Sequence, residues 1–179
     1  GCPLTEVGSS FVYSANVIGE GAFMESGITS IFSNATSVES KTFANCERLL
    51  NVKLPSAKSV GTSAFENCEK LNKVELNVVE SIQDKAFYNC SALKWIELEG
   101  NPAIGDKAFY GCSSIYNLER LNPYSIGSQA FYGTDIVYDK LEMPNLIKIS
   151  ENAFDGVEIS NLILENVEEI YDVPENANV

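Results

Sequence analysis

One short pattern recurs seven times along this chain and limits its possible folds more than any other feature. Phenylalanine returns at spacings of 20, 22, 22, 22, 22 and 23 residues, at Phe23, Phe43, Phe65, Phe87, Phe109, Phe131 and Phe154. Alanine precedes six of the seven. A β-branched residue stands five places before each one, at Ile18, Val38, Val60, Ile82, Ile104, Ile126 and Ile149. Columns that stay in phase over seven copies predict seven stacked coils of a solenoid.

Other columns predict the path of the chain within each coil. Three places after Phe stands a small residue, as a tightly packed interior corner requires, at Ser26, Cys46, Cys68, Cys90, Cys112, Thr134 and Val157. Asn or Gly stands two places after Phe in six coils. This predicts a left-handed backbone residue that closes a short helical turn over the Ala–Phe pair. Glycine follows the β-branched residue in four coils, and we expect it to mark a bend.

A stretch of alternating apolar and polar residues completes each coil and predicts a β-strand. Its apolar residues face inward and include the triplets Leu49–Val52–Leu54, Leu71–Val74–Leu76 and Leu93–Ile96–Leu98. In the last two coils the stretch shifts by one place, to Tyr138–Leu141–Met143 and Ile159–Leu162–Leu164. Because successive strands run in the same direction, we expect one parallel sheet through all seven coils, about 35 Å wide.

The repeats leave only the two ends of the 179 residues unassigned. We assign residues 1–17 to an N-terminal cap or linker, 18–170 to seven repeats of about 22 residues, and 171–179 to a C-terminal cap or truncated repeat. Hydrophobic residues make up 45% of the chain, enough for a core. No stretch approaches the roughly 18 consecutive apolar residues of a membrane-spanning helix.

The charge and the missing histidine exclude several classes of function. The net charge of −13 repels phosphate backbones and anionic lipid, so we expect no nucleic-acid or membrane-surface binding. The absence of histidine removes Ser–His and Cys–His catalysis and any His-ligated zinc site. Carboxylates on an open sheet lack the cleft that a glycosidase pair requires. We therefore expect no enzyme activity, no cofactor and no metal.

The complete repeat resembles a known family. Residues 49–68 read L-L-N-V-K-L-P-S-A-K-S-V-G-T-S-A-F-E-N-C, and residues 71–90 read L-N-K-V-E-L-N-V-V-E-S-I-Q-D-K-A-F-Y-N-C. These units resemble the BspA-type (Treponema pallidum-like) leucine-rich repeat of bacterial surface antigens. Departures are few: Ser26, Thr134 and Val157 replace Cys, and proline follows the strand only at Pro55 and Pro144. The resemblance implies a right-handed leucine-rich-repeat solenoid, with one parallel β-sheet on one face and short helical turns and loops on the other. It also implies secretion or surface display and, in many members, adhesion.

The cysteines permit more than one interpretation. Cys46, Cys68, Cys90 and Cys112 recur every 22 residues, so they line up over about 14 Å, too far for one tetrahedral zinc ion to bridge. Neighbouring Cβ atoms also lie slightly beyond disulfide geometry, which predicts a buried ladder of reduced thiols. Cys2 lies outside the ladder. Gly1–Cys2 matches the lipidation junction of lipoproteins in the family, or else Gly1 is the remnant of a tag.

The outward strand positions contain the candidate binding residues. Four successive outward positions are glutamates, at Glu75, Glu97, Glu119 and Glu142. Their mutual repulsion should raise some of their pKa values. The row has three interpretations: a solvated face partly neutralised by nearby lysines, a surface for a basic partner, or a divalent-cation site.

Aromatic residues extend the same candidate face. Trp95, the only tryptophan, is predicted to point outward, near Tyr116 and the partly inward Tyr138, with Phe32 in the glutamate column. It is either an interaction hot spot or a cover over its neighbours on the sheet. On the opposite side, Tyr88, Tyr110 and Tyr132 form a second contact strip or a structural stack, of which the stack is favoured.

These observations give two hypotheses of function. The first is a monomeric, non-catalytic module at the bacterial cell surface, extracellular or held as an outer-membrane lipoprotein. It would bind a host or bacterial surface protein of basic character through Trp95, Tyr116, Phe32 and the glutamates. The second is a structural spacer within a larger surface protein.

Overall fold

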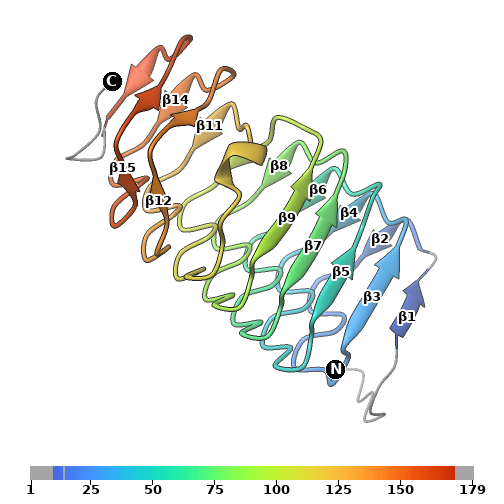
Figure 1. The fold of residues 1–179 in the computed structure, drawn as a ribbon. Helices are drawn as coiled ribbons and strands as arrows, with labels where there is room; N and C mark the ends of the chain where they lie inside the picture. Colours follow the sequence, from blue (N-terminus) through green and yellow to red (C-terminus); the bar gives the residue numbers. More distant parts are fainter. Residues whose placement is uncertain (1–9, 14, 172–179) are drawn as a thin grey trace.

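The computed structural model describes residues 10–13 and 15–171, which form a solenoid of stacked parallel coils. Figure 1 shows the coils following one another along a single axis, with the longer strands on one side and a row of short strands on the other. The described residues include no helix long and apolar enough to cross a membrane.

A parallel five-stranded sheet covers one face of the N-terminal coils. Its strands, in spatial order, are β1 (Ser10–Tyr13), β3 (Ser30–Ser33), β5 (Asn51–Lys53), β7 (Lys73–Leu76) and β9 (Trp95–Leu98). Val52, Val74 and Ile96 are in register and buried, as the apolar alternation predicts. The predicted inward and outward faces are therefore confirmed in these coils.

A second parallel sheet of two-residue strands forms the opposite wall. It contains β2 (Val17–Ile18), β4 (Ser37–Val38), β6 (Ser59–Val60), β8 (Ser81–Ile82), β10 (Ala103–Ile104), β11 (Ser125–Ile126), β14 (Lys148–Ile149) and β17 (Glu169–Ile170). The first seven of these strands each carry a member of the β-branched column, and its last member, Ile149, pairs with Ile170 of β17. The sequence does not indicate these strands, because two residues are too few to show alternation.

The expectation of one long sheet through all seven coils is wrong beyond β9. In the fifth coil a 3₁₀ helix, η1 (Leu118–Arg120), replaces the strand. The last two coils contain two separate short pairs, β12 (Val137–Tyr138) with β15 (Glu158–Ile159), and β13 (Leu141–Glu142) with β16 (Leu162–Ile163). The one-place shifts of the apolar triplets here accompany this change from one long strand to two short ones.

The core between the walls is a continuous stack of aromatic rings. All seven phenylalanines of the repeat are buried, and consecutive ring centroids lie 5.0–5.6 Å apart with nearly parallel planes. The small residues around each ring are buried as well. A row of stacked rings binds each coil to the next through dispersion and apolar burial.

The segment around each Ala–Phe pair is a series of turns, not the predicted helical turn. In each coil the residues two places before and two places after Phe have positive φ, for example Lys41 at 55° and Asn45 at 58°. Between them the Phe43 N–H donates to the Ala64 carbonyl of the next coil at 2.7 Å, so bonds within and between coils alternate. The predicted left-handed Asn and Gly positions are confirmed. The second left-handed position, which interrupts the helix, was missed because Lys, Ser and Gln occupy it in most coils.

The glycines after the β-branched column allow close approach between coils, where a bend was expected. None of Gly61, Gly105 and Gly127 has positive φ, so the left-handed region does not explain them. A Cβ atom on Gly61 would lie 2.6 Å from the Glu39 carbonyl carbon, and one on Gly127 would lie 2.5 Å from the Gly105 carbonyl carbon. At these three positions the backbone of the neighbouring coil leaves no room for a Cβ atom, whereas a Cβ atom on Gly19 would meet nothing within 4 Å.

Candidate binding face

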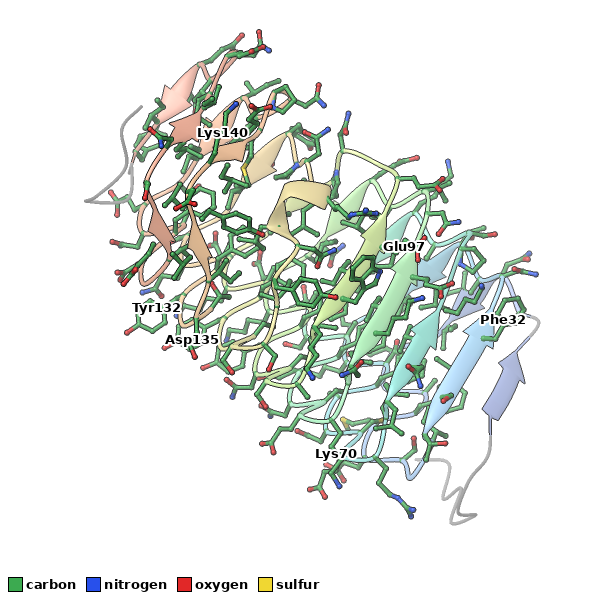
Figure 2. All side chains as sticks on the ribbon, in the orientation of Figure 1. Phe32, Lys70, Glu97, Tyr132, Asp135 and Lys140 are labelled. Carbon is green, nitrogen blue, oxygen red and sulfur yellow. The ribbon has the colours of Figure 1, made fainter. Side chains whose placement is uncertain are left out.

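The candidate site is the outward face of the five-stranded sheet, which we define by the outward side chains of β3, β5, β7 and β9. Phe32 is 37% exposed on β3, followed in register by Lys53, Glu75 and Glu97. In Figure 2, Phe32 and Glu97 lie on these strands, whereas Tyr132 and Asp135 lie among the turns at another edge of the molecule. The predicted order of outward residues on these strands is confirmed.

The charges on this face are paired with one another. Glu75 accepts from Lys53 at 2.8 Å and from Lys73 at 2.8 Å, and Lys73 also lies 3.7 Å from Glu97. The hydrogen bonds from Lys53 and then Lys73 lower the pKa of the Glu75 carboxyl. The expectation of a raised pKa is therefore wrong for Glu75, because the two lysines outweigh the effect of burial, which raises the pKa.

The other two glutamates of the predicted row do not continue this cluster. Glu142 lies on β13 in a separate two-stranded sheet, where Lys140 pairs with it and Ile163 is its register partner. Glu119 belongs to η1, and its side chain lies outside the described part of the structure. The described glutamates of the row thus lie on two sheets, and Glu75 and Glu97 lie beside Lys53 of β5 and Lys73 of β7.

The sheet ends at β9 because a side chain takes the place of the next strand. Asn117 is buried, and its amide nitrogen donates to the Ile96 carbonyl at 2.8 Å. The Ile96 N–H in turn approaches the Asn117 amide oxygen at 3.5 Å. This side chain thereby occupies backbone groups that a neighbouring strand would use, and the chain continues as η1.

The chain beyond Asn117 takes the place of a strand at the edge of the candidate face, and we call residues 118–121 the step. The Leu118 N–H donates to the Tyr138 hydroxyl at 2.9 Å, and that hydroxyl donates to the Tyr116 carbonyl at 2.8 Å. Leu118 and Leu121 of the step are buried. Tyr138 is therefore partly inward, as predicted, and it holds the step in place.

An aromatic and cationic cluster forms where the step meets the sheet. Trp95 is half-buried, and its ring lies 5.7 Å from that of Tyr116 at an interplanar angle of 59°. The Arg120 guanidinium carbon lies 5.2 Å from the centre of the Trp95 ring, which is within cation–π range. Tyr116 is 53% exposed. We call Trp95, Tyr116 and Arg120 the aromatic step. Sequence reasoning identified the two aromatic residues and missed Arg120, because only η1 brings it back to Trp95.

The cysteine ladder is buried and free of disulfides, as predicted. Each thiol donates to the carbonyl of a phenylalanine in an earlier coil: Cys68 to Phe43, Cys90 to Phe65 and Cys112 to Phe87, each at 3.1 Å. Burial raises the pKa of the Cys90 and Cys112 thiols. No group of three or more His, Cys, Asp or Glu within the described residues could hold a metal ion. Cys2 lies outside the described residues.

The tyrosines on the turn side form the favoured structural stack. The ring centroids of Tyr88 and Tyr110 lie 4.9 Å apart, and those of Tyr110 and Tyr132 lie 4.8 Å apart. Because the rings face one another, their faces are covered and mainly their edges reach solvent. The stack thus continues, outside the core, the coil-to-coil packing of the phenylalanines.

The fold and its repeat define a leucine-rich-repeat solenoid. The chain belongs to the family described as BspA type leucine rich repeat region, whose model matches residues 16–135 and 102–176 in six copies. The family expected from the repeat is confirmed. None of the curated proteins compared with the chain matches it.

Two solved structures resemble this fold. A leucine-rich repeat protein from Bacteroides ovatus is 26% identical with a TM-score of 0.63, over 82% of this chain and 39% of that chain. A leucine rich cell surface protein from Faecalibacterium prausnitzii is 18% identical with a TM-score of 0.52, over 74% of this chain and 43% of that chain. The chain thus spans about two fifths of the length of these structures.

Proposed function

We propose that this chain is a non-catalytic binding module that recognises a protein partner through the outward face of the five-stranded sheet. The aromatic step is the observation that supports this most. A half-buried tryptophan, an exposed tyrosine and an arginine in contact form the combination of residues that dominates binding energy at protein interfaces. The adjoining face, with Glu97 and Phe32, would surround this cluster in the complex.

The charge of the chain favours a partner of basic character. The net charge of −13 attracts cationic proteins and speeds their encounter, most strongly at low ionic strength. Because Lys53 and Lys73 offset Glu75 and Glu97 on the face itself, this attraction comes from the whole molecule. We propose steering by net charge, followed by contact at the aromatic step.

We also propose display at the cell surface, with a host or bacterial surface protein as the partner. The similarity to a leucine rich cell surface protein supports this location, and Cys2 is the candidate site of a lipid anchor. Mass spectrometry of the protein from its native membrane tests the anchor. An acylated Cys2 is the expected result, and an unmodified Cys2 would contradict it.

A second candidate function is that of a spacer within a longer surface protein. The observation that favours it is the greater length of both similar structures, of which this chain spans about two fifths. A spacer has no saturable partner, and it tolerates substitutions anywhere on its outward residues.

Affinity capture from host and bacterial surface extracts distinguishes the two functions. Wild type is compared with the Trp95→Ala/Glu97→Lys variant and with a control, Tyr132→Ala/Asp135→Lys, whose changes match in kind and charge and lie at a different edge (Figure 2). Circular dichroism establishes that all three proteins are folded. The proposal expects a partner that wild type and the control capture and the face variant loses. A partner lost only by the control would move the site to the tyrosine stack, and a lack of any saturable partner would favour the spacer.

A further inference from the structure

The guanidinium of Arg120 lies over the Trp95 ring and has no acidic partner among the side chains that the structure describes. Its carbon lies 5.2 Å from the centre of that ring, and within the described part of the chain the guanidinium forms no ion pair and no hydrogen bond. On the adjoining face, Lys53 and Lys73 are both paired with glutamates. Among the described side chains, Arg120 therefore presents an unpaired cation at the end of a face where Lys53 and Lys73 balance Glu75 and Glu97.

The contact with the Trp95 ring determines which groups the Arg120 guanidinium can bind. When a guanidinium lies over an aromatic ring, its N–H donors remain at its edge, in a planar fork that matches a carboxylate. The contact with Trp95 also holds the side chain in one place, so less entropy is lost when a ligand binds. The exposed ring of Tyr116, beside Trp95, offers an apolar surface next to the fork.

We propose that the aromatic step is a subsite for a carboxylate flanked by apolar groups, supplied by an aspartate or glutamate side chain of the protein partner. The carboxylate binds the edge of the Arg120 guanidinium, and the neighbouring apolar side chain of the partner packs against Tyr116. This inference rests on the proposed protein-binding role of the face and adds the chemistry of one contact.

The net charge of the chain does not prevent this contact. At physiological ionic strength, charges more than about 8 Å apart on the surface are largely screened, so the ligand responds mainly to its neighbours. Lys73 lies beside Trp95 in the sheet register and is paired with Glu75 and Glu97, which leaves Arg120 as the unpaired charge of the aromatic step. A partner can thus be basic overall and still place one acidic side chain here.

Trp95 allows a direct test, because the fluorescence of the only tryptophan reports on this subsite. The probes are the peptide acetyl-Ala-Leu-Glu-Leu-Ala-amide, its Gln counterpart, and glucuronate as an acidic sugar. The variants are Arg120→Gln and Arg120→Lys. The matched control is Arg48→Gln, which removes the same charge three coils away.

We expect the Glu peptide to change the Trp95 emission saturably and the Gln peptide to bind about tenfold more weakly. Arg120→Gln abolishes the response, Arg120→Lys weakens it because the fork is lost, and Arg48→Gln retains it. Equal binding of the two peptides, no response to the Glu peptide at millimolar concentration, or tighter binding of glucuronate than of the peptide would each overturn the inference.

The peptide titration and the capture experiment can fail separately. A captured partner whose binding is unchanged by Arg120→Gln overturns the carboxylate subsite and leaves the proposed function intact. If the peptides bind as expected but no partner is captured, the subsite stands and the proposed function fails.

Discussion

Replacing Gly61 with alanine should destabilise the solenoid by forcing two coils apart. The added Cβ would lie 2.6 Å from the Glu39 carbonyl carbon and 2.7 Å from the Ser40 nitrogen, both backbone atoms. Carbon atoms pack at about 3.5–4.0 Å, so the backbones must separate by about 1 Å. The hydrogen bond from the Gly61 N–H to the Val38 carbonyl, 2.8 Å long, holds them together at this point. Overpacking costs about 1–3 kcal/mol, and we expect about 2–3 kcal/mol because backbone cannot rotate out of the way.

Gly19→Ala is the matched control, since it makes the same change in the first coil. A Cβ atom on Gly19 would meet nothing within 4 Å, and its φ is not positive. Alanine there should be neutral or stabilise by up to about 1 kcal/mol, through the lower entropy of the unfolded chain. Urea denaturation, followed by circular dichroism and Trp95 fluorescence, gives the free energy of unfolding of each variant. Equal stabilities of the two variants would refute the close approach of coils at this column.

Three further predictions concern the core, the charged face and the thiols. Phe87→Ala removes a ring stacked between two others and should cost about 3–5 kcal/mol in the same urea assay; a loss below about 1 kcal/mol would show that the stack does not bear on stability. The pKa of Glu75 is lowered in the folded state, so its charged carboxylate stabilises the folded protein. This contribution is fully present above the ordinary glutamate pKa of about 4.3 and is lost as the pH falls through the lowered pKa. Glu75→Gln should cost no more than about 1 kcal/mol at pH 7 and flatten the loss of stability on acidification, whereas an unchanged pH profile would contradict the pairing with Lys53 and Lys73. A thiol reagent at pH 8 should leave Cys90 unmodified in the folded protein and modify it in urea, as peptide mass mapping can show; rapid labelling of the native protein would be inconsistent with the buried ladder.

The repeating features of the fold could be predicted because each is written several times in the sequence. The phenylalanine, β-branched and cysteine columns recur with almost constant spacing. A residue that matches a column by chance in one coil can therefore be recognised by comparison with the other coils. The inward positions of Val52, Val74 and Ile96 follow from ordinary alternation, and these residues are buried and in register.

The features that were missed depend on geometry between coils or on a single residue. The two-residue strands of the second sheet form because neighbouring coils align them, and no alternation marks them. The sheet ends at β9 because the amide of Asn117 bonds to the backbone of Ile96, a competition that the repeat pattern does not record. Arg120 joins Trp95 only through the η1 turn that follows, so the aromatic step could be predicted only in part.

Hydrogen exchange of the complex with its captured partner tests the binding face most directly, because it locates the contact without any substitution. The binding role predicts slower exchange on complex formation in β7, β9 and residues 116–120, with little change around Tyr88, Tyr110 and Tyr132. Protection confined to those tyrosines, or no change in any part of the solenoid, would contradict the assignment of binding to the outward face of the five-stranded sheet.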